Sequence, residues 1–274
     1  MEMPAAASSK LMRISGLKVH YLDAGAGRPV LLLHGWPTSS YLWRKIIPSL
    51  AKKRRVIAPD LPGFGKSDKP LDLSYTYEFY SDFAGRFLDA LDVNKTAMVV
   101  HDEGGPIGLL WATKNPQRLE QLAILNTFVY PKPSLLLRLI LLALKTPGVN
   151  SFLVSPYGIA TIIKIGTVNK KFLTGNVIAS YQAPYRSAEA RKVLLKAVND
   201  GSLSELEGLV SKLKSLDVPM VIIYGENDPY LRQEIKWLVA DIDKAQSIPI
   251  PDCGHFVPED SPEKLSELLV GFFA

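Results

Sequence analysis

Three side chains capable of covalent chemistry each follow a short apolar segment of the sequence. In chain order they are Asp102, Asp228 and His255. If the apolar segments are parallel strands, their carboxyl ends meet at one edge of a sheet, where ligands of such sheets bind. One carboxylate can then attack a substrate, while a histidine activates water and the second carboxylate orients that histidine. Each residue alone is commonly a solvated loop residue, but the ordered set of three favours a catalytic site.

Asp102 stands between an apolar run that begins at Thr96 and the glycine pair Gly104 and Gly105. This pattern predicts a strand, a tight turn and a closely packed helix, with the turn holding its side chain in a strained conformation that points into the site. A carboxylate there can displace a leaving group from a tetrahedral carbon and form an alkyl ester that water later cleaves, whereas serine would leave a stable ether. The position therefore indicates cleavage of a carbon–halogen or strained carbon–oxygen bond. A helix N-cap aspartate is the alternative interpretation.

The charges of the other two residues suggest their roles. His255 would activate water for the second step, and Asp228 would orient the imidazole and stabilise its charged form. The end of the preceding strand is another place for the acid, but Asn126 there carries no charge. His101 adjoins Asp102, yet neighbours on a strand point to opposite sides, so we interpret it as a packed histidine.

A second turn follows the apolar run Pro29–Leu33, in the sequence His34-Gly-Trp-Pro37. A glycine-containing turn at this place can aim a backbone N–H at a developing oxyanion. The N–H groups of Trp36 and Glu103 would form the pair and also hold the Asp102 carboxylate, each lost donor costing roughly 3–4 kcal/mol of barrier. A plain turn without such a role is the alternative.

Short apolar runs alternate with helical patterns along most of the chain, which predicts an α/β fold with a mostly parallel sheet flanked by helices on both faces. The expected strands are Lys18–Leu22, Pro29–Leu33, Val56–Ala58, Thr96–Val100, Gln121–Asn126, Met220–Tyr224 and Ala245–Ile250. The expected helices are Tyr41–Leu50, Tyr77–Leu91, Pro106–Asn115, Leu231–Val239 and Pro262–Phe273.

The strand pattern disappears between about Tyr130 and Asp217, where leucine-rich and lysine-rich helical segments are broken by proline and glycine. We therefore predict a core domain formed by residues 1–129 and 213–274, with an inserted helical cap over residues 130–212. Such an insertion is expected to cover the carboxyl edge of the sheet, where ligands bind.

The bulk properties indicate an ordinary globular protein, with 47% apolar residues and a net charge of +5 over 274 residues. The basic run Lys52-Lys-Arg-Arg55 is interpreted as a solvated helix end rather than a patch for nucleic acid or lipid. The single cysteine, Cys253, fits a reducing compartment. We find no signal-peptide pattern at the N-terminus and therefore expect a cytoplasmic protein that binds no nucleic acid.

No apolar run approaches the roughly 18 residues of a membrane span, so stable membrane insertion is not expected. The longest run, Leu135–Leu144, contains Arg138 and is interpreted as a buried or cavity-facing helix, with contact to a membrane surface as the alternative. Neither paired histidines nor a cysteine cluster is present, so we predict no metal and no cofactor. The sequence leaves a monomer or a homodimer open.

Several segments together resemble the aspartate-nucleophile branch of the α/β-hydrolase superfamily, which contains haloalkane dehalogenases and epoxide hydrolases. The segments are His34–Arg44, Asp60–Asp68, His101–Pro106, His255–Pro262 and, in the expected cap, Ser180–Tyr185, which is more similar to the dehalogenase pattern. The resemblance implies the α/β-hydrolase fold. It also implies Asp102 as nucleophile, His255 as base, Asp228 as acid, and Trp36 and Glu103 as oxyanion donors.

The chain departs from the dehalogenase pattern at the leaving-group site. Dehalogenases of this family usually carry tryptophan directly after the nucleophile, and its indole N–H binds the halide; here that residue is Glu103. An ionised carboxylate would repel a departing halide by several kcal/mol at short range. A second halide donor is commonly an asparagine at the position of Trp36 or a tryptophan of the cap, which this cap lacks. The Trp36 indole is then one candidate donor.

Epoxide opening makes a different demand, because the leaving alkoxide stays on the substrate and needs a donor, usually paired tyrosines of the cap. Tyr157, Tyr181 and Tyr185 are candidates for that role, or for simple aromatic packing. Glu103 is a further candidate if an apolar cavity raises its pKa enough to keep it protonated. A position at the start of a helix would instead favour the ionised form. Both alternatives remain open.

The sequence thus predicts a hydrolase that acts through a covalent alkyl ester on Asp102, with a small apolar organic molecule and water as substrates. Haloalkane dehalogenation comes first, and epoxide hydrolysis to a diol is the alternative. A non-catalytic ligand-binding homologue is a third reading, in which Glu103 has abolished catalysis. The presence of all three residues Asp102, Asp228 and His255 argues against it, since a pure binder does not need them.

Overall fold

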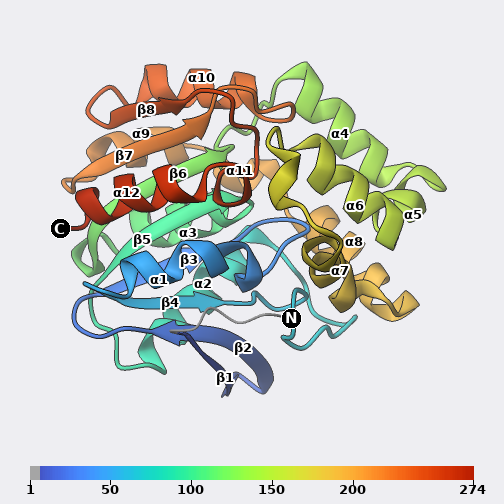
Figure 1. The fold of residues 1–274 in the computed structure, drawn as a ribbon, viewed down its shortest axis with the longest axis horizontal. Coiled ribbons are helices and arrows are strands. Elements are labelled where there is room, and N and C mark those ends of the chain that lie inside the picture. Colours follow the sequence, from blue (N-terminus) through green and yellow to red (C-terminus); the bar gives the residue numbers. More distant parts are fainter. Residues whose placement is uncertain (1–6) are drawn as a thin grey trace.

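The computed structural model describes residues 7–274, and its centre is a single eight-stranded sheet (Figure 1). The strand order is β1-β2-β4-β3-β5-β6-β7-β8. β1 pairs with β2 and β2 with β4 in antiparallel fashion, while the other five neighbouring pairs are parallel. The predicted fold class, a mostly parallel sheet flanked by helices, is confirmed. The prediction about a signal peptide rests on residues 1–6, which lie outside the described part.

Seven of the eight strands fall where the apolar runs predicted them. The strands are β1 (Ala7–Ile14), β2 (Leu17–Ala24), β3 (Pro29–Leu33), β4 (Arg55–Pro59), β5 (Thr96–Asp102), β6 (Leu119–Thr127), β7 (Met220–Gly225) and β8 (Gln246–Ile250). The sequence missed β1, because this edge strand is mostly exposed and polar and so lacks the buried alternation that marks a strand.

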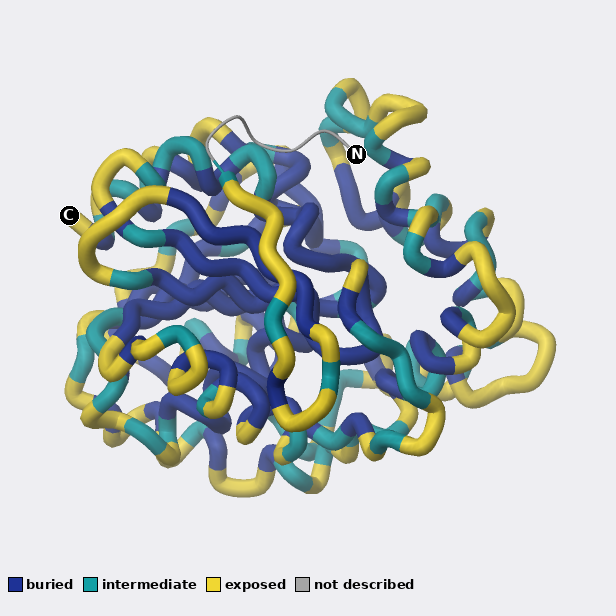
Figure 2. Tube along the Cα trace, turned by 90° about the horizontal axis from the view of Figure 1, so that it is seen from below, coloured by how far each residue is buried: buried dark blue, intermediate teal, exposed yellow. Residues whose placement is uncertain are grey.

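Helices cover both faces of the sheet, which explains why the central strands are apolar throughout rather than alternating. In β3, Val30 to Leu33 are fully buried, and the strands form the buried centre of Figure 2. On one face α1 (Ile47–Leu50) packs against α12 (Pro262–Phe272). On the other face α3 (Gly104–Lys114) lies between α2 (Tyr77–Asp89) and α9 (Leu209–Ser215). The remaining core helices are α10 (Arg232–Asp241) and α11 (Val257–Asp260).

Two local predictions need correction. The helix expected over Tyr41–Leu50 is divided into the 3-10 helix η1 (Ser40–Lys45) and the short α1. The basic run after it is solvated only in its first half: Lys52 and Lys53 are exposed, whereas Arg54 is buried and donates to the Phe273 carbonyl oxygen through Nε at 2.9 Å. Arg55 pairs with Asp23 at 3.2 Å. The second half of this run therefore makes polar contacts with the core, although Arg55 stays partly exposed.

A helical insertion, residues 128–219, joins β6 to β7, and all of its helices except α9 lie beyond one edge of the sheet (Figure 1). Its longer helices start where a serine or threonine side chain accepts from a backbone N–H one turn on, an N-cap that contributes about 1 kcal/mol each. Besides α9, its α-helices are α4 (Leu135–Lys145), α5 (Val149–Leu153), α6 (Pro156–Ile165), α7 (Gly175–Gln182) and α8 (Ala188–Asp200). No helix within residues 7–274 is long and apolar enough to cross a membrane.

The buried Glu259 carboxylate, which forms an ion pair within the core, also connects the insertion to the core through a tyrosine. Glu259, fully buried at the start of the C-terminal region, accepts from both terminal nitrogens of Arg44, one of them at 2.8 Å. The Tyr181 hydroxyl of α7 donates to the same carboxylate at 2.5 Å. Arg44 lies on η1 and Glu259 on α11, so one carboxylate joins three segments that are far apart in the sequence.

We expect Glu259→Gln to lower the free energy of unfolding by about 3–5 kcal/mol, because it leaves the buried Arg44 guanidinium without its partner. Chemical denaturation followed by tryptophan fluorescence measures this change. The matched control is Glu267→Gln, whose side chain is 70% exposed, and it should stay within about 0.5 kcal/mol of the wild type. Equal unfolding midpoints for the two variants would contradict a structural role for the buried pair.

Candidate active site

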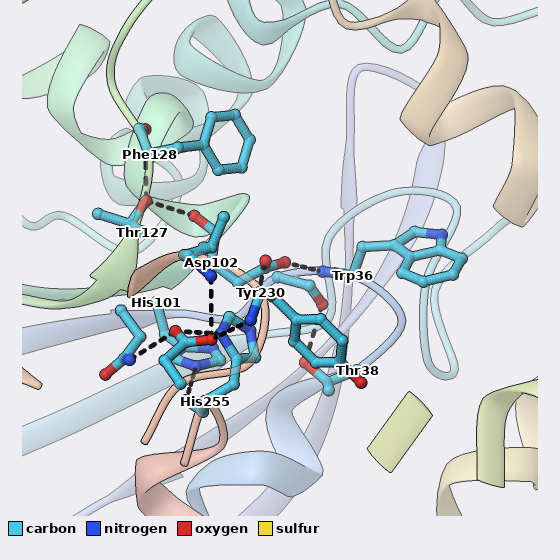
Figure 3. Close-up of polar contacts among 12 residues, drawn as sticks. Trp36, Thr38, His101, Asp102, Thr127, Phe128, Tyr230 and His255 are labelled. Atoms are coloured by element: carbon cyan, nitrogen blue, oxygen red, sulfur yellow. Dashed lines mark hydrogen bonds and ion pairs between the residues drawn. The ribbon is translucent and has the colours of Figure 1, made fainter. Parts of the chain in front are cut away.

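Asp102 is the last residue of β5 and adopts a positive φ of 52°, a strained conformation for a non-glycine residue. Its carbonyl oxygen accepts from the Thr127 hydroxyl at 2.6 Å, which holds the turn against the end of β6 (Figure 3). A Cβ at Gly104 would lie 2.4 Å from the Leu33 carbonyl oxygen, so only glycine allows α3 to start so close to β3. The strained turn and closely packed helix that the sequence predicted are both present.

The loop after β3 supplies a backbone donor to the Asp102 carboxylate. The Trp36 N–H donates to Asp102 Oδ1 at 2.7 Å (Figure 3). A Cβ at Gly35 would lie 2.2 Å from the same oxygen, so glycine is needed there for the close approach. His34 fixes the loop, because its Nε2 accepts from the Leu61 N–H at 3.1 Å and its Nδ1 donates to the Gly35 carbonyl oxygen at 3.0 Å. Burial lowers the pKa of His34, which keeps it neutral in this role.

His255 lies between the two carboxylates that the sequence grouped with it. Its Nε2 is 3.4 Å from Asp102 Oδ2, and its Nδ1 is 2.9 Å from Asp228 Oδ2. The imidazole is only 2% exposed and sits in the loop after β8. The His255 backbone N–H donates to the Gly166 carbonyl oxygen of the helical insertion at 2.7 Å, so the insertion helps to hold this loop. The structure thus brings Asp102, His255 and Asp228 together.

Asp228 is held by donors on both of its oxygens. Oδ1 accepts from the backbone N–H groups of Tyr230 at 2.7 Å and Leu231 at 3.0 Å. Oδ2 accepts from the Asn126 side-chain amide at 2.6 Å, in addition to His255. The sequence did not predict this role of Asn126, and its only signal is the position of Asn126 at the end of the strand beside β7. An uncharged amide there stabilises the neighbouring acid rather than replacing it.

The electrostatics of the three side chains favour a charged imidazole between two ionised carboxylates. Burial alone would raise the pKa of Asp102, but hydrogen bonding and charge interaction with His255, together with the Glu103 backbone N–H, lower it. Burial would likewise raise the pKa of Asp228, which the His255 charge and the Asn126 amide lower instead. Burial works against a charged His255, yet Asp228 and Asp102 raise its pKa to about 10.

His101 is packed, as predicted, but it also touches the site. Its Nε2 donates to the His255 carbonyl oxygen at 2.9 Å, and the two ring centroids are 4.8 Å apart. Burial and the nearby charge of His255 lower the pKa of His101 to about 4, so it is neutral. We interpret it as a residue that positions the backbone of the His255 loop.

Glu103 is almost completely buried beside Asp102 and lines the same cavity. It occupies the N-cap position of α3, but its side chain makes no capping hydrogen bond and contacts no donor elsewhere in residues 7–274. Burial, and then the charge of Asp102, raise the pKa of Glu103 well above its usual value. Of the two states that the sequence left open, the structure favours the protonated acid.

A cavity of about 260 Å³ lies over these residues between the core and the helical insertion. Its lining is mainly apolar and comes largely from α4 and α6, as well as from the turns that carry the polar groups. The lining residues are Trp36, Asp102, Glu103, Phe128, Leu137, Ile140, Leu141, Ala143, Leu144, Leu153, Thr161, Ile162, Ile165, Val198, Tyr230, Leu231, His255 and Phe256. Within residues 7–274, no group of three or more His, Cys, Asp or Glu residues is arranged to hold a metal ion.

The expected leaving-group donors are placed differently from the prediction. The Trp36 indole N–H donates to the Leu194 carbonyl oxygen at 3.2 Å, and the ring points away from the Asp102 carboxylate (Figure 3). Tyr157 is 80% exposed, and Tyr181 is buried against Glu259. Tyr185 is also buried, but like the other two it does not line the cavity. The three tyrosines were chosen by their place in the chain, which does not show which helix face each one occupies.

The comparisons with known proteins agree with the fold. The family model for the alpha/beta hydrolase fold matches residues 28–158. The chain is 36% identical over 272 residues to a haloalkane dehalogenase of Psychrobacter cryohalolentis, covering 94% of this chain and 88% of that one. It is 31% identical over 266 residues to a cis-3-alkyl-4-alkyloxetan-2-one decarboxylase of Shewanella oneidensis, covering 92% and 83%.

A solved structure of a haloalkane dehalogenase is also similar to this chain. The haloalkane dehalogenase DatA from Agrobacterium tumefaciens C58 is 28% identical, with a TM-score of 0.82 and coverage of 98% of this chain and 96% of that chain. The protein is therefore an α/β hydrolase. Within that fold, it belongs to the haloalkane dehalogenase-like family.

We expect Glu103→Gln to stabilise the protein increasingly as the pH rises. Unfolded Glu103 ionises near its ordinary pKa, whereas burial raises its pKa in the folded protein, so the folded state loses stability as the pH rises from the first pKa to the second. A glutamine cannot ionise and avoids this loss. Melting temperatures measured between about pH 5 and about pH 9 should therefore diverge in favour of the variant.

The exposed Glu207 provides the matched control, since Glu207→Gln should follow the wild-type pH profile. Parallel profiles for Glu103→Gln and the wild type would show that Glu103 is ionised in the folded protein.

Proposed function

We propose that this protein hydrolyses small apolar alkyl halides through a covalent ester on Asp102. The observation that carries the proposal is the position of the Asp102 carboxylate, which lies between the Trp36 N–H and His255 at the base of an apolar cavity. Asp102 Oδ1 is held by the Trp36 N–H, and Oδ2 faces His255. The similarity to haloalkane dehalogenases over nearly the whole chain supports the same activity.

In the first step, an oxygen of Asp102 attacks the carbon that carries the halogen, the carbon–halogen bond breaks, and the halide leaves with the bonding electron pair. The product is an alkyl ester of Asp102. In the second step, water attacks the carboxyl carbon of this ester, and the Trp36 and Glu103 backbone N–H groups stabilise the negative oxygen that develops. Collapse of this intermediate releases an alcohol and restores the carboxylate.

His255 acts as the base of the second step, and Asp228 orients it and stabilises its charge. In the free protein both carboxylates favour the charged imidazole. Ester formation removes the charge of Asp102, so His255 loses one of its two stabilising partners and gives up its proton more readily. The first step thus prepares the base for the second.

The protonated carboxyl group of Glu103 takes the place of a halide-binding indole. A neutral acid donates a hydrogen bond to the departing halide, whereas an ionised one would repel it. The absence of any other partner for the Glu103 side chain among the described residues leaves its proton free for this purpose. The Trp36 indole is engaged by Leu194 and is not needed as a donor.

Epoxide hydrolysis is the second candidate, and one observation favours it. A neutral carboxylic acid beside the nucleophile can protonate an alkoxide that stays attached to the substrate, as epoxide opening requires. The position of the three tyrosines counts against it, because none of them lines the cavity. We therefore rank halide displacement first.

The helical insertion is proposed to act as a cap. We propose that residues 130–212 form this cap subdomain and that residues 1–129 and 213–274 form the core. The cavity lies between the two parts, since α4 and α6 line one side of it and the turns of the sheet line the other. The cap then excludes bulk water from the ester.

The direct test of the mechanism uses a panel of short bromoalkanes and small epoxides. The wild type should release bromide catalytically. His255→Gln should release about one equivalent and keep the alkyl group as an added mass on the peptide that contains Asp102, because the ester cannot be hydrolysed. Asp102→Asn serves as the control and should do neither. Diol formation without bromide release would replace the first candidate by the second, and inactivity with both panels would reject both.

Replacement of Glu103 tests the proposed halide donor. We expect Glu103→Leu to lower kcat/KM for a bromoalkane by about 10²–10³-fold, because no donor faces the departing halide. Glu103→Gln keeps an N–H donor and should remain within about tenfold of the wild type. Wild-type activity should fall as rising pH ionises Glu103, and Glu103→Gln should lack this fall. Full activity of Glu103→Leu would contradict the assignment.

A further inference from the structure

The first helix of the insertion, α4, is apolar on nearly every side. Leu137 and Leu144 are buried and line the cavity. On the outer side Leu135, Leu139 and Leu142 are 73%, 54% and 60% exposed. The spacing of these three residues places them on one stripe of the helix. Helices that are apolar all round are normally buried, so the outer side of α4 lacks a partner within the described chain.

The neighbouring helices extend this exposed surface. In Figure 1, α4, α5 and α6 lie together at the outer end of the molecule, and the corresponding rim of Figure 2 is largely exposed. We call the exposed apolar side chains of this region the outer apolar face. It comprises Leu135, Leu136, Leu139, Leu142, Val149, Phe152 and Ile165, each at least 45% exposed. Large apolar side chains that are exposed together on neighbouring helices indicate an interaction site.

The charged residues of the same region are all positive. Residues 127–188 contain seven of the 32 Lys and Arg residues of the chain and none of its 27 Asp and Glu residues. The rest of the chain is therefore slightly acidic, and the positive charge of the protein is concentrated on the insertion. None of these seven basic side chains pairs with a carboxylate elsewhere in residues 7–274.

Two of the cations lie on α4 itself, next to the exposed leucines. Arg138 and Lys145 are exposed and stand four residues before and three residues after Leu142, so they border the same side of the helix. Lys164 is exposed directly beside Ile165 on α6. Apolar side chains bordered by lysine and arginine, without acidic residues, are typical of a helix that lies in the interface of an anionic membrane.

We propose that the outer apolar face docks on the surface of a membrane that contains anionic lipids. The leucines and Phe152 enter the boundary between headgroups and acyl chains, while Arg138, Lys145 and Lys164 contact the headgroups. A second copy of this chain fits less well, because a symmetric contact between two such faces would bring cation against cation. The docking is peripheral and requires no spanning segment.

The cavity opens beside this face. Ile165 and Thr161 of α6 are both exposed and line the cavity, so its mouth adjoins the outer apolar face. Docking would therefore place the mouth against the lipid, where an apolar substrate is concentrated. This last consequence rests on the proposed function, whereas the docking itself does not.

Vesicle co-sedimentation of the full chain tests the docking. We compare vesicles of phosphatidylcholine alone with vesicles that also contain phosphatidylglycerol. The wild type should bind the anionic vesicles, bind neutral ones much more weakly, and dissociate as salt is added. The double variant Leu139→Gln, Leu142→Gln should abolish binding, and the double variant Arg138→Gln, Lys145→Gln should weaken it by about thirtyfold. Neither pair lines the cavity.

The matched control is Lys52→Gln with Lys53→Gln, which removes two exposed charges from the core and should leave binding unchanged. Bromide release from a short, water-soluble bromoalkane is measured for every variant, so loss of docking is separated from failure of the hydrolytic mechanism. Equal binding to both vesicle types, or unchanged binding of both α4 variants, would overturn the proposal. A concentration-dependent dimer in sedimentation velocity that the leucine variant dissociates would overturn it in favour of self-association.

Discussion

A single imidazole lies between two carboxylates, the buried Asp228 and the cavity-facing Asp102, and the surrounding structure keeps all three groups in place. Burial alone would raise the pKa of both Asp102 and Asp228, and His255 is the group that lowers the pKa of each most strongly. Backbone N–H groups supply the remaining stabilisation, from Trp36 on one side and from Tyr230 and Leu231 on the other. The turn at Asp102 is strained because its carboxylate must contact the Trp36 N–H and His255 at the same time.

The helical insertion contributes to this arrangement as well as covering it. Its Gly166 carbonyl oxygen accepts from the His255 N–H, and its Tyr181 hydroxyl donates to Glu259 beside Arg44. The loop that carries the imidazole is therefore fixed from the insertion, while His101 holds it from the sheet. The insertion therefore holds the His255 loop through Gly166 and lines the cavity through α4 and α6.

The sequence was sufficient for the parts of the site that follow from strand order. Asp102, Asp228 and His255 each follow a strand, and the carboxyl ends of parallel strands must meet at one edge, so their proximity could be predicted. Side-chain direction within the insertion could not be predicted in this way. Whether Tyr181 faces the cavity or the core depends on the rotation of a short helix, which buried contacts with Glu259 decide.

Two further features depend on the folded environment rather than on residue type. The raised pKa of Glu103 results from burial beside the charge of Asp102, whereas the position of Glu103 at the start of a helix, taken alone, favours the ionised form. The β1 strand pairs with β2 through its backbone, and its mostly exposed side chains do not show the alternating apolar pattern that would predict a strand. Backbone pairing at a solvated edge leaves little signal in the sequence.

The central claim, that the Asp102 carboxylate bonds to the substrate, is tested most directly by turnover of a bromoalkane in water enriched in heavy oxygen. Attack of water on the carboxyl carbon of the ester places solvent oxygen in the Asp102 carboxylate. The first turnover should therefore yield alcohol that carries ordinary oxygen, and the peptide containing Asp102 should gain the heavy isotope. Heavy oxygen in the first alcohol formed, with an unlabelled Asp102 peptide, would show direct displacement by water and contradict the account.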